Sequence, residues 1–256
     1  LHILTRDGKI NQDTRRKLKQ VYHLYQFIEP LMATVLQQKD SLSLVDHGAG
    51  KSYLGFILYD LFLKDKAGAH VYGIETRSEL VKKSEELAQR LGFAKGMSFL
   101  AMTVEESITS TELPQKIDIV TALHACNTAT DDAIRFALAR DAQYIVLVPC
   151  CQAEVAAALR VNKGKTLGKT PLSELWRHPI HTREFGSQLT NVLRCLQLEA
   201  RGYQLTVTEL VGWEHSMKNE LIIAKKTGGF KKSARERQLE ILKECNLEAL
   251  AERFAY

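Results

Sequence analysis

The stretch Leu42-Ser43-Leu44-Val45-Asp46-His47-Gly48-Ala49-Gly50-Lys51-Ser52 decides the fold of this chain. An apolar run ends in an acid, two glycines follow with one residue between them, and a segment with helical spacing comes next. A strand that ends in such a turn and continues into a helix directs several backbone N–H groups at one place. Because side chains at the glycines would keep a ligand away from the backbone, the pattern indicates a ligand site after a first strand.

Two phosphate-binding motifs are similar to this turn but fail at defining positions. The P-loop pattern G-x-x-x-x-G-K-[ST] would require its first glycine at Val45. The dinucleotide pattern G-x-G-x-x-G would require its last glycine where Tyr53 stands. Since two glycines can also serve only close packing, other residues must identify the ligand.

A second carboxylate follows one helix later in the chain. His70–Glu75 is an apolar stretch that predicts a short strand ending in an acid. One carboxylate can accept hydrogen bonds from both hydroxyls of a ribose, so we predict that Glu75 contacts a ribose. The alternative is that Glu75 only caps the helix that begins in Thr76–Glu79.

The rest of the chain alternates strand and helix patterns, as a doubly wound sheet does. Helices are predicted over 51–65 and 77–91, the latter ending at Gly92, and a further amphipathic helix begins in 130–134. The last two predicted strands are joined by a short connection and should pair antiparallel. The strands predicted after His70–Glu75 span 97–102, 117–123, 144–148, 203–211 and 220–225.

Both ends of the chain are basic and amphipathic. Residues 12–37 predict one or two helices with an apolar face, and a helix is predicted from Lys231 to Tyr256. We therefore predict an N-terminal helical extension over 1–40, a ligand-binding domain over 41–228 and a C-terminal helical tail over 229–256.

Composition limits the class of protein. The 256 residues suffice for one domain with a substantial core. The chain shows no apolar run of about 20 residues and no signal sequence, which predicts a cytoplasmic protein without membrane contact. The cysteines show no C-x-x-C spacing, so neither a zinc site nor a disulfide framework is indicated. There are five of them: Cys126, Cys150, Cys151, Cys195 and Cys245.

Positive charge gathers in residues 160–183, directly after the fifth predicted strand. This segment contains several lysines and arginines but one acid, Glu174, and the whole chain has a formal net charge of +5. A flexible basic loop at the carboxyl edge of the sheet would grip phosphates of a nucleic acid through Lys163, Lys165 and Lys169. A solvated surface loop is the alternative.

With its glycine turn and its acid after the second strand, the chain resembles the class I S-adenosylmethionine (SAM)-dependent methyltransferases over residues 41–226. Their first motif reads apolar-(D/E)-x-G-x-G, and their fold is α/β, a seven-stranded doubly wound sheet with a reversed last strand. The resemblance implies that SAM is the cofactor and that the chemistry needs no metal. The implied SAM contacts are Asp46, Gly48, Ala49, Gly50, Glu75 and Leu123.

One branch of that family is similar at three motifs. Its members show D-x-G-x-G-K, then L-H-x-C after strand four and a cysteine pair after strand five. Here these are Asp46–Lys51, Leu123–Cys126 and Pro149–Cys151. The branch includes tRNA 2′-O-methyltransferases, in which a histidine follows the cysteine pair. Gln152 stands at that position here, so the resemblance does not assign tRNA as the substrate of this chain.

Two residues after these strands are candidates for catalysis. His124 is a candidate general base for a hydroxyl acceptor, because the pKa of imidazole lies near neutrality, or it orders the backbone around SAM. Cys151 resembles the P-C-Q nucleophile of cytosine C5-methyltransferases. The RNA enzymes that use a cysteine after strand five also carry Pro-Cys after strand four, which this chain lacks. Packing of Cys150 and Cys151 beneath the crevice is the alternative.

The basic segments and the resemblance favour RNA as the methyl acceptor. A protein side chain or a small metabolite is the enzymatic alternative. A catalytically silent protein of the same fold, acting as a binding module, is a third possibility. The acceptor atom and the oligomeric state are not determined by the sequence.

Overall fold

A computed structural model describes residues 12–123, 128–149, 153–162, 171–210 and 220–255. Its centre is one seven-stranded sheet with the strand order β3-β2-β1-β4-β5-β7-β6. Pairing is parallel from β3 to β5, and β7 runs antiparallel to both β5 and β6, which confirms the predicted fold class. The strands are β1 (Leu42–His47), β2 (Ala69–Glu75), β3 (Met97–Ala101), β4 (Ile119–Leu123), β5 (Tyr144–Val148), β6 (Tyr203–Glu209) and β7 (Glu220–Lys226).

The strand order reverses at β1. Asp46 of β1 lies opposite Gly73 of β2 on one side and opposite Thr121 of β4 on the other. Because these strands are parallel, their carboxyl ends meet at one edge of the sheet. In open α/β sheets the ligand crevice lies at this kind of switch point.

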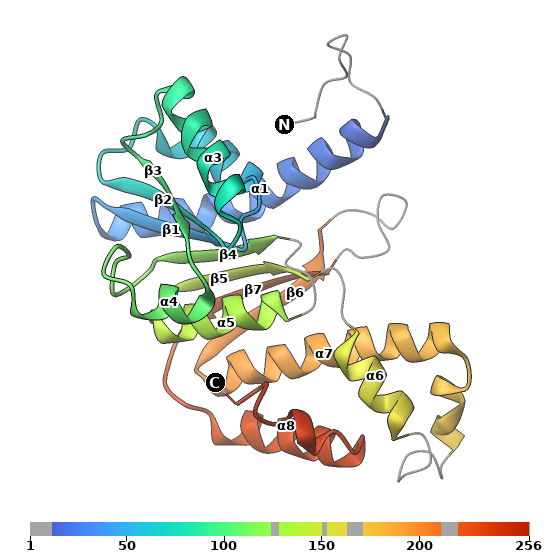
Figure 1. Ribbon diagram of the computed structural model, residues 1–256. Helices are drawn as coiled ribbons and strands as arrows, with labels where there is room; N and C mark the ends of the chain where they lie inside the picture. The colour runs from blue at the N-terminus through green and yellow to red at the C-terminus, as the bar shows by residue number, and fades with distance from the viewer. Residues whose placement is uncertain (1–11, 124–127, 150–152, 163–170, 211–219, 256) are drawn as a thin grey trace.

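Helices cover both faces of the sheet (Figure 1). One hydrophobic cluster joins Tyr144, Val146 and Val148 of β5 to the helices of one face, and another joins Ile145 and Leu147 to those of the opposite face. Burial on both faces explains why the parallel strands are nearly continuous apolar runs. The first face carries α1 (Gln12–Gln38), α2 (Tyr53–Leu58) and α3 (Ser78–Leu91); the second carries α4 (Val104–Thr109), α5 (Ala129–Ala139) and the C-terminal part of α7 (Pro179–Ala200).

The N-terminal segment forms one helix, α1, that continues through Pro30. A proline inside a helix costs about 3 kcal/mol, because it removes a hydrogen bond and clashes with the preceding turn. Leu24, Ile28, Met32 and Val35 are nevertheless all buried in the cluster that covers β1. Burial of this stripe on both sides of Pro30 offsets the local cost and keeps one helix.

Three predicted helix boundaries differ from the structure. The helix predicted over 51–65 starts as α2 at Tyr53, because Ser52 has a left-handed φ of 47°. It then widens into a π-helical turn, η1 (Tyr59–Leu63). The C-terminal helix α8 (Lys232–Glu244) ends well before Tyr256 and is followed by a short 3-10 turn, η4 (Glu248–Leu250). By contrast, α3 ends as predicted at Gly92, whose φ is 74°.

The prediction of a flexible loop over 160–183 is wrong for the part that the structure describes. A 3-10 helix, η3, spans Pro171–Trp176, and α7 begins at Pro179, where proline fits the first helical turn. The preceding helix α6 (Glu154–Val161) packs so closely on α7 that a Cβ on Gly186 would lie 2.7 Å from that of Ala156. Gly186 therefore allows α6 and α7 to pack closely, although a glycine within a segment weakens the prediction of a helix from sequence.

Across the described segments, no helix combines the length and apolar character that a bilayer crossing requires.

Candidate cofactor site

The turn between β1 and α2 exposes backbone. Gly48 and Gly50 have φ values of 70° and 56°, a region that favours glycine. The N–H of Ala49 donates to the carbonyl of Ile74 at 2.9 Å, which ties the turn to β2. A Cβ built on Gly50 would meet no atom within 4 Å, so the space beside this residue is open. This open space beside bare backbone is where the sequence analysis places a ligand.

Asp46 lies beneath this turn and is buried. Its carboxylate accepts hydrogen bonds from the hydroxyls of Ser52 at 3.1 Å and Thr121 at 3.0 Å. Burial raises the pKa of Asp46 to about 6, although both hydrogen bonds act in the opposite direction. Asp46 therefore joins β1, the start of α2 and β4, and titrates close to neutrality.

Glu75 joins the end of β2 to the glycine turn. Its Oε2 accepts from the N–H of Gly50 at 2.9 Å, and the Arg77 guanidinium donates to both carboxylate oxygens at 3.0 and 3.1 Å. Burial alone would raise the pKa of Glu75, but the hydrogen bonds from Arg77 and Gly50 outweigh it and lower the pKa to about 2. Glu75 is thus ionised, and a ribose that binds there would displace Arg77, whose side chain is 60% exposed.

A cavity of about 410 Å³ lies at these strand ends, within the range of about 300–1,000 Å³ that is typical of small-molecule sites. Its walls come from the ends of β1 and β2, from the segment after β3 and from the start of α5. Carboxylate and backbone groups on one side suit ribose hydroxyls, and the apolar residues after β3 suit a planar base. Lining residues include His47, Gly48, Glu75, Met102, Val104 and Asp132.

A buried ion pair fixes the α5 side of this cavity. Arg194 of α7 donates to both carboxylate oxygens of Asp131, at 2.6 and 2.8 Å. Both side chains are buried, and Asp131 precedes the lining residue Asp132. Since breaking one partner of such a pair leaves a buried charge unpaired, Arg194 holds the start of α5 in place.

The structure thus brings four of the predicted cofactor residues together. Gly48 and Glu75 line the cavity, Gly50 bonds to Glu75, and Asp46 lies below. The remaining two lie beside them: Ala49 bonds to β2, and Leu123 ends β4 opposite Val148 of β5. The predicted catalytic residues His124 and Cys151 and the predicted phosphate contacts Lys163, Lys165 and Lys169 lie outside the described residues.

Two lining residues of the cavity, His47 and Arg77, are not predicted from the sequence. His47 fills the unspecified position of the first motif, lines the cavity and packs its ring on Phe136 with centroids 5.2 Å apart. The signal in the sequence that could have indicated His47 is its position as a polar residue at the end of an apolar strand. In the sequence, Arg77 belongs to the predicted helix start at Thr76–Glu79, and the motif does not specify which groups contact Glu75.

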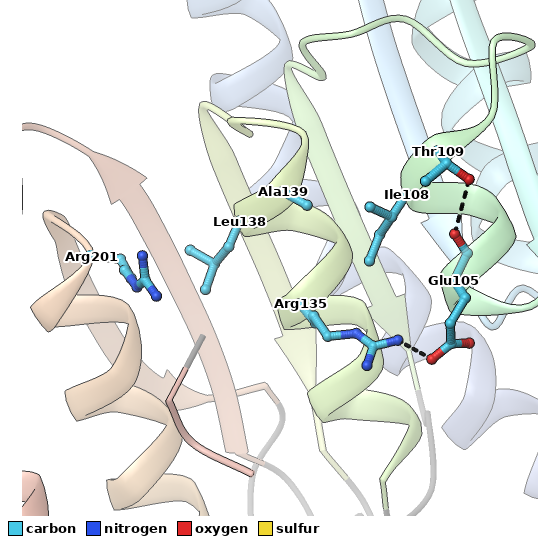
Figure 2. Close-up of a pocket in the computed structure, with 7 residues that line it drawn as sticks. All are labelled: Glu105, Ile108, Thr109, Arg135, Leu138, Ala139 and Arg201. Atoms are coloured by element: carbon cyan, nitrogen blue, oxygen red, sulfur yellow. Dashed lines mark hydrogen bonds and ion pairs between the residues drawn. The ribbon is translucent and has the colours of Figure 1, made fainter. Parts of the chain in front are cut away.

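A second cavity lies away from the strand ends, between α4, α5 and the residue that follows α7 (Figure 2). Its volume is about 480 Å³, and its wall includes the apolar residues Ile108 and Leu138. Figure 2 shows the guanidinium of Arg135 directed at Glu105, with which it forms an ion pair, and Arg201 on the opposite side of Leu138. No cofactor contact predicted from the sequence lines this cavity.

Among the described residues, no three or more histidine, cysteine, aspartate or glutamate side chains gather closely enough to hold a metal ion.

Several solved structures are similar to this one. A TM-score of 0.44 and 13% identity relate it to an rRNA methylase from Streptococcus thermophilus, over 74% of this chain and 89% of that one. TrmK from M. capricolum, in complex with S-adenosylhomocysteine (SAH), has a TM-score of 0.44 and 12% identity, over 84% of this chain and 90% of that one. An O-methyltransferase from Bacillus cereus, also in complex with SAH, has a TM-score of 0.47 and 11% identity, over 85% of this chain and 83% of that one. No curated protein matches the chain in sequence.

A protein-family model described as a methyltransferase domain matches residues 16–158, which is more than half of the chain. The matched region runs from α1 through the glycine turn, Glu75 and β4 to α6, and it contains the cavity at the strand ends. The open space beside Gly50 could accept the amino-acid portion of SAM, and the ionised Glu75 could accept hydrogen bonds from its ribose. The chain therefore belongs to this methyltransferase-domain family and is a SAM-dependent methyltransferase.

Proposed function

We propose that the protein transfers the methyl group of SAM to RNA, with SAM bound in the cavity at the ends of β1 and β2. The main support for this placement of SAM is the hydrogen bond between Gly50 and Glu75. It joins the glycine turn to the acid at the end of β2, and both motifs contribute residues to the cavity wall. Glu75 would hold the ribose, and Gly48 and Gly50 would leave room for the amino-acid portion.

SAM supplies an electrophilic methyl group when it is bound. The protein would contribute by placing the acceptor in line with that group and by excluding water, effects that lower the barrier without a covalent bond between enzyme and substrate. His124 and Cys151 follow β4 and β5, whose ends lie beside each other where Leu123 pairs with Val148. We propose that His124 accepts a proton from a hydroxyl acceptor and that Cys151 packs without attacking the base.

The choice of RNA is supported by charge and by the similarity to the branch that includes tRNA 2′-O-methyltransferases. Within residues 160–183, the side chains of Arg160, Arg177 and Arg183 are exposed. Arg177 and Arg183 pair with neighbouring glutamates, so Lys163, Lys165 and Lys169 would carry most of the phosphate contact. Each phosphate contact adds affinity that falls as salt rises.

Radiolabelled SAM separates the candidate acceptors. The protein would be incubated with cellular RNA, bulk protein or a metabolite extract, and we expect label in RNA that ribonuclease removes. Label in protein or metabolites alone would reject RNA as the substrate. No label in any fraction, with SAH still bound, would favour a binding module.

Variants then test the catalytic assignment on the labelled RNA. His124→Ala should lower turnover about 10²- to 10⁴-fold, the usual worth of a general base, with SAH affinity nearly unchanged. Cys151→Ser should remain active, and 5-fluorocytosine RNA should form no covalent adduct. An adduct lost in Cys151→Ser would instead identify Cys151 as the nucleophile.

A further inference from the structure

His47 is a buried polar side chain whose ring has an unpaired nitrogen. It is the last residue of β1 and is 7% exposed. Within the segments that the structure describes, its Nε2 is buried and has no hydrogen-bond partner. Nearly all buried polar groups in folded proteins are paired, so an orphan at the wall of a ligand cavity needs an explanation.

Packing alone does not require a histidine at this position. Side chains alternate along β1, so His47 faces the same side of the sheet as Val45, whose apolar side chain belongs to the same cluster as Phe136. A phenylalanine at position 47 would keep the ring contact with Phe136 and would bury no unpaired nitrogen. The imidazole nitrogen of His47 is therefore useful only if a ligand or an ordered water forms a hydrogen bond with it.

The surroundings of His47 keep its ring neutral. Burial lowers the pKa of His47 to about 4; Glu75 on β2 acts in the opposite direction, and Arg135 on α5 acts in the same direction as burial. Asp132 of α5 lines the same cavity. A neutral imidazole offers one N–H donor and one acceptor, which suits a nucleoside that carries groups of both kinds.

We propose that His47 is a cofactor-binding residue that hydrogen-bonds the nucleoside portion of SAM, directly or through one ordered water. This inference rests on the proposed placement of SAM in the cavity at the ends of β1 and β2. It assigns a role to the motif position that the sequence pattern leaves unspecified, and it explains why the first strand ends in a polar residue beside Gly48.

Two histidines on neighbouring strands provide a matched experiment. His70 of β2 is paired, with its Nε2 2.8 Å from the hydroxyl of Ser98, and it is not a lining residue of the cavity. Binding of SAH would be measured by calorimetry, and melting temperatures would be measured without ligand, for wild type, His47→Phe, His47→Gln and His70→Phe. SAH reports cofactor affinity without turnover.

For His47→Phe we expect SAH to bind about 3- to 10-fold more weakly, the worth of one hydrogen bond, while the ligand-free melting temperature stays the same or rises. His47→Gln should recover part of the affinity. His70→Phe should melt at a lower temperature and bind SAH as wild type does.

Two results would overturn the role of His47 alone: wild-type affinity in His47→Phe, or weaker binding that accompanies a lower melting temperature and is not recovered in His47→Gln. SAH binding that is also unaffected by Gly50→Ala would overturn the cavity assignment itself, and with it this inference.

Discussion

The two cavities of this protein differ in what forms their walls. The cavity at the strand ends has a volume of about 410 Å³ and is lined by a glycine turn and by the carboxylate of Glu75, whose pKa is about 2. The cavity between α4 and α5, of about 480 Å³, is larger, but helix side chains line it and its Arg135 is neutralised by Glu105. Open backbone and the charge of Glu75, rather than size, therefore distinguish the proposed cofactor site from the other cavity.

The largest expected effect separates two glycines with similar backbone. Gly50 and Gly92 have φ values of 56° and 74°, and a Cβ on either would meet no atom within 4 Å. Alanine at either position should cost about 1–2 kcal/mol of stability, because the left-handed region disfavours a Cβ. Only Gly50→Ala should lose SAH binding, because its Cβ would enter the space that we propose for the cofactor. Calorimetry on both variants measures this, and equal losses of SAH binding would show that the effect comes from backbone strain and not from the space beside Gly50.

A second effect depends on pH and on Asp46 below the glycine turn. The folded-state pKa of about 6 lies above the ordinary value of 3.8, so the folded protein binds this proton more tightly than the unfolded chain. The corresponding stabilisation is present below pH 4 and is lost as the pH rises through 6. From pH 8 to pH 4, wild type should gain roughly 2.5 kcal/mol relative to Asp46→Asn in urea unfolding. A difference that is independent of pH would show that Asp46 is not buried as the structure places it.

Glu75→Gln tests the directed charge of the cofactor cavity. The amide keeps the size of the side chain but loses the charge that accepts from Gly50 and, as proposed, from the ribose. Hydrogen bonds to a charged group are worth about 1.5–3 kcal/mol, so SAH should bind about 10- to 100-fold more weakly. Glu105→Gln in the other cavity is the control and should leave SAH affinity unchanged. A loss of less than twofold in Glu75→Gln would argue against a ribose contact.

The smallest effect is expected at the cavity between α4 and α5. Arg201→Ala removes one wall residue and a hydrogen bond of 3.0 Å to the carbonyl of Ala255. Because this bond is exposed, stability should fall by less than about 1 kcal/mol. SAH affinity should stay within twofold of wild type, and a tenfold loss would show that this cavity takes part in cofactor binding.

Features that depend on short-range chemistry can be predicted from the amino-acid sequence. The glycine turn after β1, the acid that ends β2, the cap at Gly92 and the antiparallel pairing of the last two strands each follow from a few neighbouring residues. Backbone preferences and alternating hydrophobicity act locally, so a single chain displays them. The same local patterns predict that Asp46, Gly48, Gly50 and Glu75 lie together, because their spacing places them at one edge of a parallel sheet.

Contacts between distant parts of the chain are visible only in the tertiary structure. Asp131 appeared in sequence only as an acid at a helix start, whereas the fold buries it against Arg194. The close packing of α7 on α6 depends on Gly186, which lies against Ala156 although the two residues are far apart in sequence. The raised pKa of Asp46 and the unpaired nitrogen of His47 arise from burial by β2, β4 and α5. Burial and pairing between remote residues have no local pattern, which is why they could be seen only in the folded protein.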